Sequence, residues 1–319
     1  MNKNKINNKI IISSVSILLI IFIILAIIYF KMPKVSSNSK EIRTKSTEIN
    51  VEYSETELTG EWQDYKAKIS LSDEKIVIEG TGVTNSENEI KITTAGTYYI
   101  TGTVSDCNIV IEATKNDNVQ LVLDNCDITS KTTAPINGIK CNLLTITLAE
   151  NSNNRVSDTE NYTIFTNTEK TEPDGTIFTK TNLVINGTGY LTVNSNYLDG
   201  IVSKDTLKIV NANINIISKD DGIRGKDYVA INSANITIDA GGDGIKSTND
   251  ENETLGYIAI ESGEFNITAV NDGIQAETIL NISENPKINI KTTAVQSSNN
   301  SNNNNFRKRF KRNDAKFFK

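Results

Sequence analysis

Histidine is absent from all 319 residues of the chain. Its absence removes the side chain that most often acts as a general base near neutral pH, and also the commonest protein ligand of transition metals. It excludes every nucleophile activated by a neighbouring imidazole, such as the Ser-His and Cys-His pairs of hydrolases. The chemistry of this protein must therefore use carboxylates, amides, basic side chains and the backbone.

Cysteine is scarce, with Cys107, Cys126 and Cys141 as an odd set in which no two cysteines have CxxC spacing. Zinc sites and disulfide frameworks use paired cysteines at short spacings, so the pattern argues against both. We interpret the three thiols as residues of the hydrophobic core.

Positive charge is scarce in the middle of the chain. The formal net charge is −6, but residues 1–34 and 306–319 are basic, which leaves −17 for residues 35–305. Such an acidic body repels nucleic acid phosphate and attracts divalent cations. We therefore expect calcium as the cofactor and no nucleic acid partner.

A single long apolar run extends from Ile10 to Phe30, with lysines on both sides. About 20 apolar residues are needed for a membrane helix, and lysines before the helix place the N-terminus inside. Because no small-residue cleavage site follows, we expect a lysine-rich cytoplasmic stub (1–9), a retained single-pass anchor in the cell membrane (10–30) and an extracellular domain. The alternative is a cleaved export signal and a secreted protein. The polar residues 31–50 are typical of a linker.

Internal repetition is the strongest signal in the rest of the chain. An Asp-Gly-Ile-x tetrad begins at Asp199, Asp221, Asp243 and Asp272, at intervals of 22, 22 and 29 residues, and two short β-branched strands follow each tetrad in step. Three strands and three turns in about 22 residues, without a helix, are typical of one coil of a solenoid. We predict an all-β fold, a right-handed single-stranded parallel β-helix over residues 51–295, followed by a disordered Asn-rich and basic tail (296–319).

Alternation along each coil assigns the faces of the first strand. The residues expected to point inward are Ile201, Ile223, Ile245 and Ile274, with the small residues Ser203, Gly225, Ser247 and Ala276. The residues expected to point outward are Val202, Arg224, Lys246 and Gln275. The buried aliphatic ladder would stabilise each coil, at about 1.5–3 kcal/mol per residue.

Three stretches, residues 96–104, 119–128 and the Asp-Gly-Ile coils with 225–227 and 241–247, together resemble a bacterial carbohydrate-binding family known from clostridia. The resemblance covers roughly residues 52–290. It implies a polysaccharide-lyase-like parallel β-helix that binds calcium. It also implies binding of cellulose-like and acidic plant polysaccharides such as polygalacturonate.

The tetrad aspartates should stack one per coil, about 4.8 Å apart, where bare carboxylates repel one another unless a cation neutralises them. Calcium takes six to eight oxygen ligands, which these turns can supply. The candidate metal ligands are Asp199, Asp220, Asp221, Asp243, Asp272, Asp205, Asp227, Asn271, Asp250 and Glu251. The alternative is that Asp-Gly only forms the corner of each coil, with Asp capping the backbone and Gly at positive φ.

Basic side chains accompany this ladder on the outer face. Lys204, Arg224, Lys226 and Lys246 are the candidate polysaccharide-binding residues, because cations at this spacing can hold uronate carboxylates. The alternative is that they are ordinary solubilising residues. Tyrosines near the turns could also stack on sugar rings: Tyr190, Tyr197, Tyr228 and Tyr257.

The sequence thus favours an extracytoplasmic, calcium-dependent protein that binds acidic or plant cell-wall polysaccharide. Two alternatives stay open. A calcium-dependent polysaccharide lyase would use Arg224 as the base that abstracts a proton beside a uronate carboxylate. A structural or adhesive surface solenoid would have the same fold and no affinity for sugar.

Overall fold

The computed structural model describes residues 49–163, 172–293 and 308–310, all of which belong to one compact unit, Ile49–Lys319. The predicted stub, the predicted membrane span and nearly all of the predicted linker lie outside the described residues. Within the described ranges, no helix has the length and apolarity needed to cross a bilayer.

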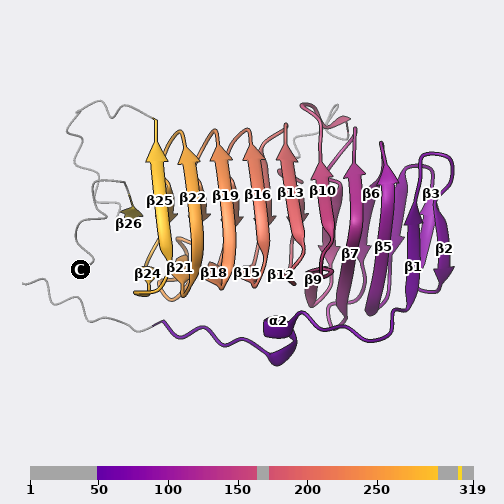
Figure 1. Cartoon of the computed structure of the whole chain (residues 1–319), viewed down its shortest axis with the longest axis horizontal. Helices are drawn as coiled ribbons and strands as arrows, with labels where there is room; N and C mark the ends of the chain where they lie inside the picture. The colour runs from indigo at the N-terminus through magenta and orange to yellow at the C-terminus, as the bar shows by residue number, and fades with distance from the viewer. Residues whose placement is uncertain (1–48, 164–171, 294–307, 311–319) are drawn as a thin grey trace, which may run out of the picture. The chain divides into compact units, whose positions relative to one another are not determined.

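The strands form an all-β solenoid in which each coil contributes one strand to each of three columns (Figure 1). Column 1 contains β4 (Glu89–Ile92), β6 (Asn108–Glu112), β8 (Ile136–Lys140), β11 (Gly175–Thr179), β14 (Asp199–Ser203), β17 (Ile223–Gly225), β20 (Ile245–Ser247) and β23 (Ile274–Ala276). Column 2 contains β1 (Ala67–Leu71), β5 (Gly96–Val104), β7 (Asn118–Thr129), β9 (Leu143–Leu148), β12 (Asn182–Asn186), β15 (Thr206–Val210), β18 (Tyr228–Asn232), β21 (Tyr257–Ile260) and β24 (Leu280–Ile282).

Column 3 begins with the second halves of β5 and β7 and continues with β10 (Asn153–Ser157), β13 (Tyr190–Ser195), β16 (Asn213–Ser218), β19 (Ala234–Ala240), β22 (Gly263–Ala269) and β25 (Lys287–Thr292). Within the columns, neighbouring strands are parallel. Antiparallel strands stand at the two ends: β2 (Val77–Gly80) pairs with β1, β3 (Val83–Ser86) with β4, and β26 (Lys308–Phe310) with β23.

The strand register confirms the predicted repeat, because Ile201 pairs with Ile223, Ile223 with Ile245, and Ile245 with Ile274. These four isoleucines are fully buried in the main core, and the small residues predicted to point inward are buried as well. The three cysteines are also buried core residues and are not disulfide-bonded. Burial raises the pKa of Cys107 and of Cys126 to about 12, so these thiols are unreactive.

The surroundings of Val202 differ from those expected for a residue predicted to point outward. Its side chain leaves the coil as predicted, but it is fully buried in a second apolar cluster with Ala134, Tyr162 and Phe178. Tyr162 belongs to a loop segment that covers this part of column 1. Gln275 is likewise buried. Outward direction therefore does not mean exposure where another segment lies over the coil.

Most of the corners that need a left-handed residue lie between columns 2 and 3, where Asn125, Gly187, Asn211 and Ser233 have positive φ. The Asp-Gly corners differ, because their glycines do not adopt positive φ. Glycine is required there for space: a Cβ on Gly222 would lie 2.6 Å from the carbonyl oxygen of Gly244 and 2.7 Å from Cγ2 of Ile238. The expected positive φ at Asp-Gly is therefore wrong, whereas the expected backbone capping by Asp is correct, as shown below.

Residues 49–65 form an extended arm that crosses the outer face of column 2 from β24 to β1 (Figure 1). The amide of Asn186 donates to the carbonyl oxygens of Thr56 and Glu57, and Val51 packs on Ala230 and Ala259. The arm contains the short helix α2 (Glu55–Thr59), whose N-terminus is closed by a capping box of Ser54 and Glu57. Column 2 is thus covered along most of its length.

Candidate functional site

The tetrad aspartates form a ladder at the start of the column 1 strands. One carboxylate oxygen of each of the first three accepts a hydrogen bond from the backbone N–H of the aspartate in the next coil. The Oδ1 atoms of Asp199, Asp221 and Asp243 lie 3.0, 2.8 and 2.9 Å from the nitrogens of Asp221, Asp243 and Asp272. The aspartates therefore tie successive coils together, as expected for capping side chains.

Two cations occupy the other oxygens of this ladder. Nε of Arg224 donates to Oδ2 of Asp199 at 2.6 Å, and Nη2 of Arg224 lies 2.7 Å from Oδ2 of Asp174. Nζ of Lys246 lies 3.1 Å from Oδ2 of Asp221 and 2.8 Å from Oδ2 of Asp243. Two of the predicted polysaccharide-binding cations thus neutralise the aspartates from within the protein.

The same pairing sets the protonation of these groups. Burial raises the pKa of Asp199 to about 7; Asp221 adds to this rise and Arg224 opposes it. Burial also raises the pKa of Asp221, which Lys246 opposes. Burial by itself would lower the pKa of Arg224, but the charges of Asp199 and Asp174 outweigh it and hold the pKa above its ordinary value. Arg224 is therefore firmly protonated, which opposes its predicted alternative role as a base.

Lys204 and Lys226, the other two predicted polysaccharide-binding cations, also have carboxylate partners. Nζ of Lys204 lies 2.8 Å from Glu172, and Nζ of Lys226 lies 3.3 Å from Glu251. The Lys226 pair is more exposed than the Arg224 and Lys246 pairs. Because exposed ion pairs are weak, Lys226 can exchange its partner for a ligand at little cost.

Three predicted metal ligands do come together, since Asp199, Asp220 and Asp221 each present a carboxylate oxygen within 4.8 Å of the others. Asp220 is exposed, and its side chain forms no hydrogen bond or ion pair with any residue that the structure describes. A Cβ on Gly242 would lie 2.2 Å from Oδ1 of Asp220 and 2.6 Å from Oδ1 of Asp221. Gly242 therefore leaves the space in which these two carboxylates converge.

The remaining predicted metal ligands divide between two places. Asp243, Asp272 and Asn271 stay at the ladder end of column 1, whereas Asp205, Asp227, Asp250 and Glu251 follow the opposite ends of the strands. At that second place Asp227 accepts a hydrogen bond from the amide of Asn249 at 2.6 Å. Burial, together with the neighbouring Asp227, raises the pKa of Asp205. The ten residues are therefore not one site.

Of the four predicted stacking tyrosines, Tyr190 is the exposed one, at 58%. Tyr197 stacks on Tyr162 with ring centroids 4.1 Å apart. Tyr228 and Tyr257 stack on each other at 4.8 Å and pack against the arm. The sequence could not distinguish the exposed tyrosine from the packed ones, because the arm and the covering loop that pack on them have no periodic pattern.

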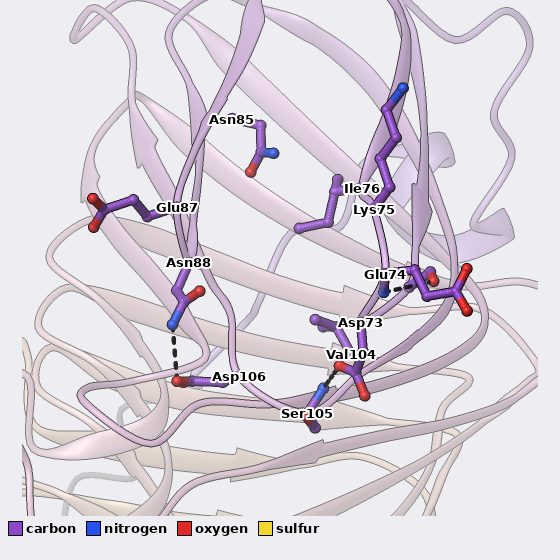
Figure 2. Close-up of a pocket in the computed structure, with 11 residues that line it drawn as sticks. Asp73, Glu74, Lys75, Ile76, Asn85, Glu87, Asn88, Val104, Ser105 and Asp106 are labelled. Carbon is purple, nitrogen blue, oxygen red and sulfur yellow. Dashed lines mark hydrogen bonds between the residues drawn. The ribbon is translucent and has the colours of Figure 1, made fainter.

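An open polar cleft of about 490 Å³ lies at the first coils, between the turn that joins β1 to β2 and the β3–β4 hairpin (Figure 2). Hydrogen bonds from Ser105 N to Asp73 and from Asn88 to Asp106 brace its walls. Ile76 and Asn85 face one another across it in Figure 2, and Glu74 and Glu87 stand at opposite rims. The sequence repeat does not predict this cleft, because the cleft is formed by turns outside the repeat.

Known proteins resemble this chain in both sequence and structure. A curated carbohydrate-binding domain-containing protein from Acetivibrio thermocellus is 35% identical over 154 residues, which are 48% of this chain and 54% of that protein. The chain thus matches only about half the length of this relative. A solved structure, described as the polysaccharide lyase-like protein from C. thermocellum in a gadolinium derivative, matches with a TM-score of 0.64 and 32% identity. This match covers 72% of this chain and 95% of the solved one.

The family model described as carbohydrate-binding domain-containing protein matches residues 86–312, which include every coil from β4 onward and all four Asp-Gly-Ile tetrads. This agreement extends over well more than half of the chain and agrees with the resemblance seen in the repeats. The chain belongs to this carbohydrate-binding domain family.

Proposed function

We propose that this protein is an extracytoplasmic polysaccharide-binding protein whose affinity for acidic polysaccharide depends on calcium. Family membership supports binding of carbohydrate. The apolar run at residues 10–30 supports a location outside the cytoplasm with a membrane anchor, and the fold is proposed to wind right-handed, as parallel crossover connections do.

The observation that carries the calcium proposal is the convergence of Asp199, Asp220 and Asp221 beside Gly242. Calcium prefers carboxylate and carbonyl oxygens and completes its shell with water. Asp220 offers a carboxylate without a competing partner among the described residues, whereas Arg224 and Lys246 compete with the ion for Asp199 and Asp221. The residues therefore fit a calcium ion of modest affinity, held mainly through Asp220.

A bound calcium ion would supply positive charge at an otherwise acidic edge. Uronate carboxylates repelled by the aspartates could then bind through the ion and through Lys226, whose pair with Glu251 is exposed. We do not propose lyase activity, because Arg224 is held protonated by two carboxylates. Incubation with polygalacturonate and calcium should yield no unsaturated product by ultraviolet absorbance.

The test is retention of the full chain on immobilised polygalacturonate, with calcium or with chelator, for wild type and Asp220→Asn. We expect chelator to abolish retention and Asp220→Asn to weaken the calcium-dependent part about tenfold, since one tenfold step corresponds to about 1.4 kcal/mol. Asp64→Asn is the matched control, because Asp64 is an exposed aspartate of the arm, outside this cluster.

Two results would contradict the proposal. Retention that is equal with and without chelator would contradict the proposed role of calcium, while polysaccharide binding itself would still stand. Failure to bind any polysaccharide, acidic or neutral, would remove the binding function and favour a structural or adhesive solenoid.

A further inference from the structure

Column 3 differs from the other two columns because its outer face is open in the part of the chain that the structure describes. The arm covers column 2, and the loop with Tyr162 covers part of column 1. In Figure 1 the strands from β10 to β25 lie side by side as a flat front layer. In β16 and β19 buried side chains alternate with outward ones, most of which are exposed.

The centre of this face carries a row of short uncharged polar side chains, one from each of β13, β16, β19, β22 and β25, while Arg155 takes the same register position in β10. Strand register places Thr192 beside Asn215, Asn215 beside Thr237, Thr237 beside Asn266, and Asn266 beside Asn289. Successive members are therefore about 4.8 Å apart, the spacing of neighbouring strands. We call these five residues the amide row.

Most of the hydrogen-bonding capacity of the amide row is unused. Asn289 donates to Asn266 at 3.4 Å, but among the described residues the side chains of Thr192, Asn215 and Thr237 form no hydrogen bond. Asn215 and Thr237 are exposed. An amide and a hydroxyl each offer both donors and acceptors, as sugar hydroxyls do. These residues therefore contribute little to stability and can bind a polyhydroxylated ligand.

Exposed apolar side chains flank the row at one end. Tyr190 in β13 is 58% exposed and Ile217 in the adjacent β16 is 52% exposed. An exposed tyrosine offers a rigid apolar face at low entropic cost together with a polar hydroxyl. The amide row together with Tyr190 and Ile217 thus provides hydrogen bonds and apolar contact on one flat surface.

We propose that this face binds a neutral, extended polysaccharide that runs across the strands, along the solenoid axis. The amide row has no charge, and Asp239 on the same face would repel a polyuronate, whereas the charge of Glu264 is paired with that of Lys287. A row with one member on each of five successive strands suits a polymer that repeats along its length, because each added contact raises the effective affinity of the next. The inference rests on the proposed carbohydrate binding and assigns neutral polymers a surface separate from the aspartate ladder.

The experiment compares retention of the full chain on cellulose, a neutral glucan, and on polygalacturonate with calcium. The variants are Asn215→Ala/Thr237→Ala and Tyr190→Ala. The matched controls are Asn116→Ala/Thr93→Ala, an exposed amide and an exposed hydroxyl on other surfaces, and Tyr65→Ala, another exposed tyrosine. We expect each variant to weaken retention on cellulose about tenfold, with no effect of chelator and no change on polygalacturonate.

Several outcomes would overturn the inference and are distinguishable. If the variants bind cellulose as wild type does, this face does not bind neutral polysaccharide. The same conclusion follows if wild type binds polygalacturonate but not cellulose, and in both cases the proposed function still stands. Loss of binding to both polymers by wild type would remove both proposals. A change of oligomeric state in Asn215→Ala/Thr237→Ala would identify the face as a contact between copies of the chain.

Discussion

Arg224 reaches back one coil to Asp199, with its Nε atom 2.6 Å from Oδ2 of that aspartate. Both side chains are largely buried, at 15% and 4% exposure. The pair therefore shapes three properties of the candidate site: its stability, its protonation and its affinity for cations.

Replacing Arg224 by Ala should destabilise the fold strongly. Asp199 would stay buried without its cation and Asp174 would keep only Lys204, at 3.8 Å. Breaking a buried pair from one side costs about 3–5 kcal/mol. Urea unfolding followed by circular dichroism measures this loss. Lys226→Ala is the control, since its exposed pair with Glu251 should contribute about 0–1 kcal/mol. Equal effects of the two substitutions would contradict the assigned burial.

Gly222→Ala tests the steric role of the Asp-Gly corners. The added methyl group would overlap the carbonyl oxygen of Gly244 in the next coil and the side chain of Ile238 in the coil of Gly222 itself. Overpacking of this kind costs about 1–3 kcal/mol. Asp220→Ala in the same corner should change the free energy of unfolding by less than about 0.5 kcal/mol, as an exposed substitution does. A tolerated Gly222→Ala would mean that the glycine serves flexibility and not space.

The stability of the fold should fall as the pH rises from about 4 to about 7. Burial raises the pKa of Asp199 to about 7 and also raises the pKa of Asp158 and of Asp221, whereas an unfolded aspartate titrates near about 3.9. Between these values the folded protein holds protons that the unfolded chain has released, so each step up in pH favours unfolding.

Urea unfolding across this pH range measures the slope, and Asp199→Asn should flatten it. Below about pH 4 the slope should reverse, because hydrogen bonds to the Ser105 backbone lower the pKa of Asp73. The ion pair with Lys91 does the same for Glu112. A stability that rises steadily from pH 4 to 7 would show that Asp199 is ionised throughout.

Lys208→Met should loosen the arm without unfolding the solenoid. Nζ of Lys208 donates to the Glu52 carbonyl oxygen at 2.8 Å and pairs with Glu57 at 3.0 Å, which holds the arm against β15. Limited proteolysis should then cut within residues 49–65 faster than in wild type, while the far-ultraviolet spectrum of the strands is retained. Trp62, the one tryptophan of the chain, reports release by its fluorescence. Unchanged cleavage would mean that Val51 and the Asn186 amide suffice.

The fold was predictable from sequence where one signal repeats. Ile201, Ile223, Ile245 and Ile274 recur in register with two further strands, and this period specifies the stacked coils without knowledge of distant contacts. The arm was not predictable, because Val51 packs on residues about two hundred positions away and belongs to no repeat.

The sequence identified the residues of the candidate site, but it did not predict which partners those residues bind. Stacking of Asp199, Asp221 and Asp243 follows from the period, but their partners depend on side-chain reach. Lys246 extends to both Asp221 and Asp243, so cations expected to face solvent instead satisfy the ladder. Asp205 and Asp227 belong to the same coils but lie at the other strand ends, which spacing alone does not separate.

The course of the arm decides how the molecule bears load. Ile49 lies at the last coil, where its carbonyl oxygen accepts from Asn281, and the chain returns from there to the first coil. A pull applied through the preceding residues therefore reaches the β24 end first. It must peel the arm away contact by contact, past β21, β18, β15 and β12, before any tension arrives at β1, so the arm shields the opening coils from mechanical unravelling.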